Sequence, residues 1–241
     1  MRFMLALWLS AMSCCAQLIG MNQIAAPAAS GGGGGSITFI QSTNRAAAAS
    51  VSSLSIAFNS ANTAGNMIIV GVYFGAQSVS PTVTDTQGNT YGSADNATNQ
   101  VTDGHETCVF HSSNIHAGAN TVTVSFGASY AFNAITVAEV SVVSALDKTA
   151  AAQNNGSTSP SSGNTATTTA ANEFLFGHIG GSGASGGATP EAGWTAICTN
   201  TIGGGFTSFA EYKIVSSTGA YAATATLDQA NDSDTIIATY K

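Results

Sequence analysis

The segment Thr121-Val-Thr-Val-Ser-Phe126 alternates strictly between apolar and hydroxyl-bearing side chains. In an extended chain Val122, Val124 and Phe126 fall on one face, while the threonines and Ser125 fall on the other. A period of two residues predicts a β-strand with one face in a core and one face in water. Almost nothing beyond residue 35 has the spacing of an amphipathic helix, so the chain is predicted to be all-β.

Strand patterns cover most of the chain after residue 35. Met67-Ile-Ile-Val-Gly-Val-Tyr-Phe74 is apolar on both faces, which predicts a central strand covered on each side. Many short strands at a spacing of about ten residues predict a β-sandwich of jelly-roll or immunoglobulin-like type. The predicted strands are 36–41, 51–58, 67–74, 81–85, 90–92, 106–113, 120–126, 134–143, 145–149, 165–169, 173–179, 195–199, 206–215, 221–227 and 235–240.

The chain also repeats itself. Thr63-Ala-Gly-Asn-Met-Ile-Ile-Val-Gly71 corresponds to Thr169-Ala-Ala-Asn-Glu-Phe-Leu-Phe-Gly177, and Gly118-Ala-Asn-Thr-Val-Thr-Val-Ser-Phe126 corresponds to Gly219-Ala-Tyr-Ala-Ala-Thr-Ala-Thr-Leu227. Similarity in several separate segments predicts two duplicated units of about 100 residues each. Because no Pro/Gly/Ser-rich linker separates them, the predicted units, 36–144 and 145–241, are expected to form one β-sandwich body.

The N-terminus has the pattern of an exported protein. Residues 1–16 carry one positive charge, a short apolar run and small residues, which predicts a secretory signal peptide. The apolar run is far shorter than the roughly 20 residues that span a bilayer, so no transmembrane span is predicted. Lipidation at Cys14 or Cys15 is an alternative. Residues 17–35 end in five glycines and are predicted to be a flexible leader before the folded part, 36–241.

Charge is scarce and negative. Only 7% of the residues are charged, and five Lys or Arg stand against twelve Asp or Glu, for a net charge of −7. So few cations cannot form the basic stripe that nucleic acid requires, so no nucleic-acid partner is expected. A Ser, Thr, Asn and Gly surface is typical of extracellular proteins, and the predicted location is secreted or at the cell surface.

Cys108 and Cys198 are the cysteines left after the predicted signal peptide. In an exported protein such a pair predicts a disulfide, here one that would join the two halves. The alternative is two buried thiols, because an unpaired cysteine behaves as a small apolar side chain.

Two glutamates invite a comparison with sandwich-type glycoside hydrolases, which place a pair of carboxylates across a concave sheet. Glu139 and Glu211 lie in predicted strands and are the candidate catalytic residues. Neither belongs to a strand dense in carboxylates, and a structural role for each is the alternative. The many serines lie in low-complexity stretches, so no nucleophilic serine is predicted.

Metal and ligand candidates are few. Asp228, Asp232 and Asp234 lie close together in the sequence and could offer oxygen ligands to a structural calcium ion, or form a solvated turn. The four histidines are too irregularly spaced to predict a metal site, and no other cofactor is expected. Trp194, with Tyr91 and Tyr212, could form a platform for sugars, although core packing is the alternative.

Four segments carry a further pattern: Asn62-Thr-Ala-Gly-Asn66, Val83-Thr-Asp-Thr-Gln-Gly-Asn-Thr-Tyr91, Asn114-Ile-His-Ala-Gly-Ala-Asn-Thr-Val-Thr-Val124 and Gly219-Ala-Tyr-Ala-Ala-Thr-Ala-Thr226. Together they resemble a widespread group of secreted, functionally uncharacterised bacterial β-sandwich proteins. The resemblance covers nearly all of 36–241 and implies export and a sandwich fold, without supplying active residues.

The leading hypothesis is a secreted, non-enzymatic structural or adhesion subunit that assembles with itself into oligomers or filaments. An extended segment, 21–26 or 36–41, would add a strand to the sheet edge of a neighbouring copy. The alternative is a glycan-binding module whose partner is an extracellular polysaccharide. A hydrolase that uses Glu139 and Glu211 is the third hypothesis.

Overall fold

The computed structural model describes residues 35–76, 79–99, 104–182, 187–203 and 205–241. The predicted signal peptide, Cys14, Cys15 and nearly all of the predicted leader lie outside the described residues. The described residues contain strands and no helix, and so no helix that could cross a membrane. In chain order the strands are β1 (Thr38–Ala47), β2 (Val51–Ala57), β3 (Met67–Phe74), β4 (Thr82–Asp85), β5 (Gly92–Asn99), β6 (His105–Ser112), β7 (Thr121–Tyr130), β8 (Asn133–Ser141), β9 (Leu146–Ser157), β10 (Asn172–Ser182), β11 (Ala188–Pro190), β12 (Thr195–Gly203), β13 (Phe206–Ser216), β14 (Ala225–Leu227) and β15 (Asn231–Tyr240).

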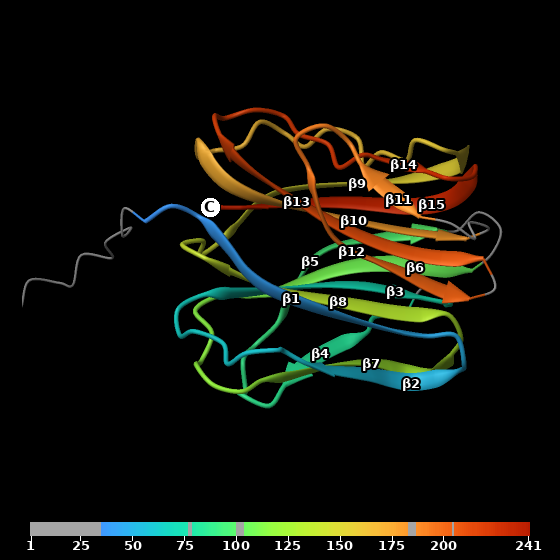
Figure 1. Cartoon of the computed structure of the whole chain (residues 1–241), viewed down its shortest axis with the longest axis horizontal. Coiled ribbons are helices and arrows are strands. Elements are labelled where there is room, and N and C mark those ends of the chain that lie inside the picture. The colour runs from blue at the N-terminus through green and yellow to red at the C-terminus, as the bar shows by residue number, and fades with distance from the viewer. Residues whose placement is uncertain (1–34, 77–78, 100–103, 183–186, 204) are drawn as a thin grey trace, which may run out of the picture. The chain divides into compact units, whose positions relative to one another are not determined.

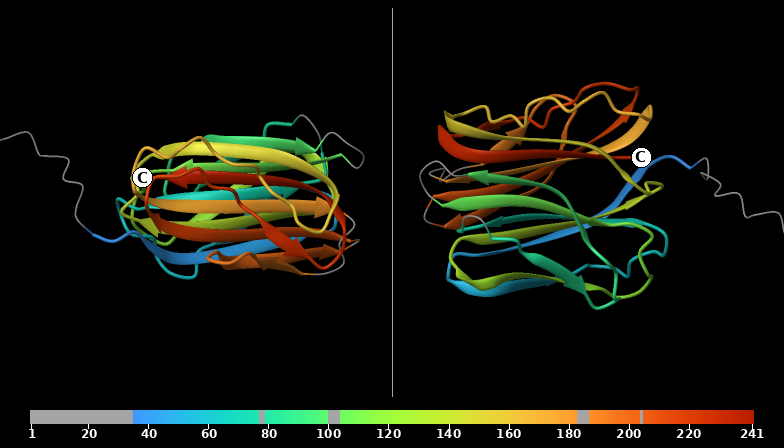
Figure 2. Two further views of the ribbon diagram at one scale, coloured as in Figure 1. Left: turned by 90° about the horizontal axis from the view of Figure 1, so that it is seen from above. Right: turned by 180° about the vertical axis from the view of Figure 1, so that it is seen from behind.

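The strands form four antiparallel sheets stacked as layers (Figures 1 and 2). Inner sheet 1 has the order β1-β8-β3-β6-β5, and inner sheet 2 has the order β12-β13-β10-β15-β9. Outer sheet 1, β2-β7-β4, covers inner sheet 1, and outer sheet 2, β11-β14, covers inner sheet 2. The all-β prediction and the β-sandwich prediction are confirmed. Among the first eight strands the chain switches repeatedly between inner and outer sheet, which favours the jelly-roll alternative.

The two inner sheets share one strand order. Read from one edge, inner sheet 1 has the order β1, β8, β3, β6, β5. Inner sheet 2 has, in the matching positions, β9, β15, β10, β13, β12. The predicted sequence repeat aligns Gly71 with Gly177, yet Gly71 faces His178 of the other inner sheet and Gly177 faces Ala223 of the outer layer. A shift of one residue turns a strand's side chains to the opposite face. The duplication therefore stays a prediction, and what the halves share is the order of their strands.

Apolar side chains fill three regions between the layers. The alternation that begins at Thr121 places Val122, Val124 and Phe126 in the core between inner sheet 1 and outer sheet 1, as predicted. A second core joins the two inner sheets, and a smaller one lies beneath outer sheet 2. β3 contributes to the first two cores at once, which explains why it is apolar on both faces.

The contact between the inner sheets, here called the central seam, depends on close approach at two glycines. A Cβ on Gly71 would lie 2.8 Å from the ring of His178, and a Cβ on Gly180 would lie 2.2 Å from the ring of Tyr73. Only glycine fits at such distances. His178 Nε2 lies 3.0 Å from Ser208 Oγ, and burial lowers the pKa of His178 to about 3, so the imidazole is neutral.

Candidate functional site

Glu139 lies on β8 with no exposed surface and fixes the turn that precedes β3. Its Oε1 accepts hydrogen bonds from the Thr63 backbone N–H (2.8 Å) and from Asn66 Nδ2 (2.7 Å). Its Oε2 accepts from Asn62 Nδ2 and Gln41 Nε2, both at 2.7 Å. Burial favours a higher pKa, but these donors outweigh it and lower the pKa of Glu139. With both oxygens occupied, the carboxylate is suited to a structural role.

The corresponding turn before β10 is held by a second carboxylate, Asp147 of β9. Its Oδ2 accepts the Thr169 backbone N–H at 2.6 Å, and its Oδ1 lies 2.8 Å from Lys241 Nζ and 3.4 Å from Lys148 Nζ. Burial acts against ionisation, yet the hydrogen bonds from Lys241, Thr169 and Glu173 lower the pKa of Asp147. These five residues, Asp147, Lys148, Thr169, Glu173 and Lys241, are called the Asp147 cluster below.

Glu211 lies on β13 and faces outer sheet 2, again without exposed surface. Among the described residues no side chain donates a hydrogen bond to its carboxyl oxygens, although the backbone N–H of Thr224 faces them. Burial, reinforced by the negative charge of Glu191, raises the pKa of Glu211 to about 8. The carboxyl group is therefore mostly protonated at neutral pH.

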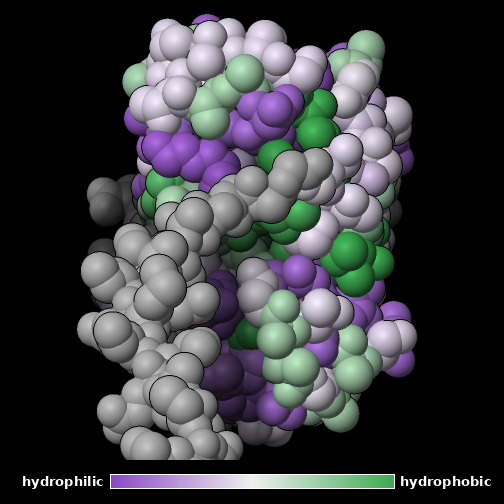
Figure 3. Space-filling view, turned by 90° about the vertical axis from the view of Figure 1, so that its left-hand side faces the viewer, coloured by the Kyte–Doolittle hydropathy of each residue, from purple (hydrophilic) through white to green (hydrophobic). Residues whose placement is uncertain are grey.

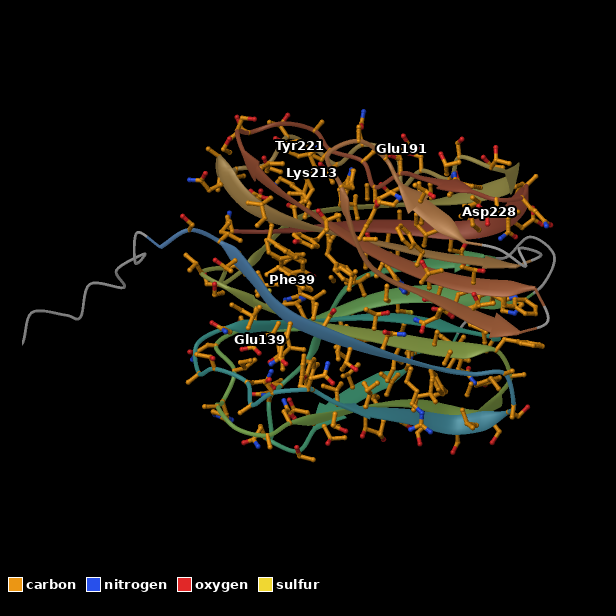
Figure 4. The ribbon with its side chains drawn as sticks, in the orientation of Figure 1. Phe39, Glu139, Glu191, Lys213, Tyr221 and Asp228 are labelled. Carbon is orange, nitrogen blue, oxygen red and sulfur yellow. The ribbon has the colours of Figure 1, made fainter. Side chains whose placement is uncertain are left out.

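The two candidate catalytic glutamates are not brought together. Glu139 shares a face of β8 with Ile135 and Val137, which pack toward outer sheet 1, whereas Glu211 faces outer sheet 2. Figure 4 shows Glu139 in the lower half and Lys213, two residues from Glu211 on β13, in the upper half. Glycosidases need two carboxyl groups within about 10 Å across one substrate. Here both inner sheets lie between the groups, so the geometry gives the hydrolase hypothesis no support.

The predicted aromatic platform is dispersed over three places. Tyr91 packs on the first core and donates its hydroxyl hydrogen to Asp85 Oδ2 at 2.8 Å. Tyr212 stacks on Phe39 across the central seam, with ring centroids 4.6 Å apart. Trp194 is half-buried beside the core under outer sheet 2. The three rings pack in three different cores and do not form one platform.

The three candidate calcium ligands are also separated. Asp228 Oδ2 accepts the Gly187 N–H and Asp232 Oδ1 accepts the Gly156 N–H, both at 2.7 Å, while Asp234 is buried. β15 begins at Asn231, so Asp232 and Asp234 belong to a strand and not to one loop with Asp228. Within the described ranges no group of three or more His, Cys, Asp or Glu side chains could hold a metal ion.

The predicted disulfide was wrong, since Cys108 and Cys198 are free thiols. Cys108 lies on β6 and faces the first core, beside Glu106. Cys198 lies on β12 at the central seam, with its Sγ 3.0 Å from Thr136 Oγ1. The two side chains occupy different cores. The structure therefore agrees with the alternative interpretation, in which the cysteines are unpaired and act as small apolar side chains.

One side of the stack presents a series of edge strands, here called the edge wall: β2, β1, β12 and β11, one from each layer. β1 packs against both β2 and β12, and Figure 1 looks onto this side. Arg45 is the one charged residue in these four strands, and its Nη1 donates to the Ser55 carbonyl oxygen of β2 at 2.8 Å. Ile40 of β1 is 44% exposed. The edge wall is therefore nearly free of charge.

The opposite side differs. β5 packs against β9 there, and β4, β5 and β9 carry Asp85, Asp95, Asp147 and Lys148. The view from behind in Figure 2 shows these strands. Charged side chains and bulges are common means by which proteins prevent edge strands from pairing with other chains. The edge wall has bulges in β1 and β12 but lacks the charges.

Comparison with protein-family models, curated proteins and solved structures finds no match to this chain.

The sequence analysis missed the Asp147 cluster and the edge wall. Asp147, Thr169, Glu173 and Lys241 are far apart in the chain, and only the pairing of β9, β15 and β10 brings them together. One signal was present: Leu146-Asp-Lys-Thr precedes the Thr169 segment as Phe39-Ile-Gln-Ser precedes the Thr63 segment, and this match could have pointed to Asp147 near the Thr169 turn. The edge wall could not be predicted, because it depends on which strands lie at the sheet edges, and the sequence pattern does not give the strand order.

Proposed function

We propose that this protein is a secreted, non-enzymatic structural or adhesion subunit that assembles with copies of itself through the edge wall. The observation that carries this proposal is the near absence of charge on four stacked edge strands. Edge strands present unpaired N–H and C=O groups, which pair with another strand unless something prevents it. A second edge that meets the wall in antiparallel register would satisfy these groups.

Exposed apolar surface supports the same proposal. Ile40 and Val142 are 44% and 45% exposed, and they lie near the position where the start of β1 pairs with the end of β8. Figure 3, which faces this end of the stack, shows strongly apolar residues near its middle, beside polar surface. Apolar side chains at a sheet edge add favourable burial to the backbone hydrogen bonds of an added strand.

The donor strand has one remaining candidate in this chain. Residues 38–41 already belong to β1 and pair with β8 of the same inner sheet, so the predicted segment 36–41 is not free to pair elsewhere. The segment 21–26 lies outside the described residues and stays the proposed donor. Deletion of 17–35 should abolish assembly if the leader donates the strand, and should leave assembly intact if edge walls pair directly.

Assembly is tested by light scattering after size exclusion and by negative-stain electron microscopy of the chain without its signal peptide. Thr199→Lys with Thr201→Lys puts two charges on exposed positions of β12, and the expected result is loss of oligomers. Ala151→Lys, at an exposed position of β9 on the opposite side, is the matched control and should assemble normally. A wild-type chain that stays monomeric at high concentration would overturn the proposal.

A glycan-binding module is the second candidate, now restricted to one place. Trp194 and Tyr221 are half-buried against the same small core, and Glu191 Oε1 nearby accepts a hydrogen bond from Thr226 Oγ1 at 2.8 Å. Figure 4 shows Tyr221, Lys213 and Glu191 together in the upper half. Polysaccharides that bind there should quench or shift the fluorescence of Trp194, and unchanged emission would remove this candidate.

A further inference from the structure

The Asp147 cluster contains an amine and a carboxyl group in contact across neighbouring strands. β9 and β15 are antiparallel and pair Leu146 with Tyr240, and a register irregularity next to this pair leaves Asp147 diagonal to Lys241 across the two strands. The backbone continues this pairing, because Lys241 N–H donates to the Ala145 carbonyl at 2.9 Å. Lys241 Nζ then lies 2.8 Å from Asp147 Oδ1. Two reacting groups held at about 3 Å need little further ordering to react.

A second acid completes the cluster. Glu173 lies on β10, on the other side of β15, and has no exposed surface. Its Oε1 accepts the Ala170 N–H at 3.2 Å, and its side chain hydrogen-bonds Asp147. Burial and then the hydrogen bond and negative charge of Asp147 raise the pKa of Glu173, although hydrogen bonds from Thr239 and Ala170 act against this. Glu173 is therefore placed to hold a proton beside the Asp147 carboxylate.

Two further contacts orient the reacting groups. The Thr169 backbone N–H donates to Asp147 Oδ2 at 2.6 Å, where it would stabilise negative charge that develops on this oxygen. Lys241 Nζ donates to Thr169 Oγ1 at 2.6 Å, which holds the amine beside Asp147 Oδ1. The Asp147 side chain is only 2% exposed, whereas the Lys241 side chain reaches it from the surface and is 39% exposed.

We propose that Lys241 and Asp147 condense to form an intramolecular isopeptide bond, with Glu173 relaying the proton. The amine of Lys241 attacks Cγ of Asp147, a C–N bond forms, and one C–O bond breaks. Protonated Glu173 first gives its proton to the Asp147 carboxylate and takes one from the Lys241 ammonium, which frees the amine. During the attack it gives a second proton to the leaving oxygen and takes one from the nitrogen, so water departs and Glu173 ends protonated as it began. An ammonium and a carboxylate thus give an amide and one water molecule, and no oxidant or other reactant is needed.

The equivalent turn in the first half of the chain, held by Glu139, has no amine that could form such a bond. Glu139 occupies the equivalent turn, but its four donors are a backbone N–H and three side-chain amides, none of which is a nucleophilic amine. Lys148 is the other amine near Asp147, at 3.4 Å from Oδ1, and it also donates to the Asp147 backbone carbonyl at 3.2 Å. Lys148 is sequence-adjacent to Asp147, whereas Lys241 approaches from the neighbouring strand.

Intact-mass spectrometry of the chain without its signal peptide tests the bond. The wild-type protein is expected to weigh one water molecule less than its sequence, and fragmentation should give one branched peptide that contains Asp147 and Lys241. Lys241→Arg keeps the ion pair but offers no comparable nucleophile, so the mass deficit should be lost completely. Lys148→Arg is the matched control and should keep the full deficit.

Glu173→Gln tests the relay, because the amide keeps the volume but cannot pass the proton. The expected result is a folded protein, checked by its thermal transition, without the mass deficit. A deficit that persists in Glu173→Gln would overturn the role of Glu173. A wild-type mass equal to the sequence mass, after prolonged incubation at neutral pH, would overturn the bond itself. The bond forms within one chain, so this failure would leave the proposed assembly standing.

Discussion

Two buried carboxylates hold equivalent turns in the two halves of this protein, and they are held in different ways. Glu139 receives four neutral donors, one from the Thr63 backbone and three from amide side chains. Asp147 receives the Thr169 backbone N–H in the same manner, but its other neighbours are two lysines and a second acid. Neutral amide donors stabilise a carboxylate but cannot react with it. The Asp147 carboxylate lies beside a nucleophilic amine and a second carboxyl group that can carry a proton.

The largest expected effect is on the Glu139 side of the comparison. Glu139→Ala removes the acceptor of the Thr63 N–H, Asn62 Nδ2 and Asn66 Nδ2, while Gln41 Nε2 keeps the Ser60 carbonyl, and each fully buried donor left unpaired costs about 1–3 kcal/mol. The free energy of unfolding should fall by roughly 5 kcal/mol, measured by urea denaturation at neutral pH. Glu191→Gln, at an exposed position, is the control and should change it by less than about 0.5 kcal/mol. A Glu139→Ala protein as stable as wild type would show that the donors find water instead.

Glu211 extends the comparison to a buried carboxyl group that lacks side-chain donors. Burial raises its pKa from 4.5 to about 8 in the folded protein. The folded chain therefore keeps a proton that the unfolded chain loses, so stability is greatest below pH 4.5 and falls as the pH rises to about 8. At 1.36 kcal/mol per pKa unit the loss is roughly 5 kcal/mol.

Glu211→Gln should remove this dependence, because the amide does not ionise. Thermal or urea unfolding between pH 4 and pH 9 measures the difference between the variant and the wild type. The variant should gain stability relative to wild type as the pH rises. Parallel pH profiles would mean that Glu211 ionises normally and that water reaches it.

The smallest effect compares the two threonines. Thr63 gives Glu139 its backbone N–H, whereas Thr169 adds a hydroxyl that contacts both Asp147 and Lys241. Thr169→Ala should cost about 1 kcal/mol in unfolding free energy, and Thr63→Ala should cost much less. Both threonines are exposed, so a difference in burial does not contribute to the difference between the two losses of unfolding free energy. Equal losses would mean that the Thr169 hydroxyl is not needed by the cluster.

The sequence predicted strands well where alternation or apolar length is strong. The predicted strand 67–74 coincides with β3, and Thr121–Tyr130 contains the alternating segment. β5, Gly92–Asn99, was largely missed because Gly, Asp and Asn have low strand propensity, and pairing with β6 overrides it. The predicted strand 145–149 ends before the polar run that follows Ala152, yet β9 reaches Ser157 through its pairing with β15. The predicted strand 165–169 is not formed.

The amino-acid composition gave no information on where the charged side chains lie. The net charge is −7, but six carboxylate side chains are almost fully buried. Composition counts charges without locating them, and burial of each one depends on donors that lie far away in the sequence. The buried carboxylates are Glu106, Glu139, Asp147, Glu173, Glu211 and Asp234.

The glycines of the central seam restrict how this protein can evolve. Gly71 leaves room for the His178 ring, and Gly180 leaves room for the Tyr73 ring, so each half supplies a gap that a ring from the other half occupies. A change at either glycine is tolerated only together with a smaller residue opposite. The halves are thus bound to change in pairs, and a chimera that exchanges one half for that of a distant relative would need to import its matching gaps as well.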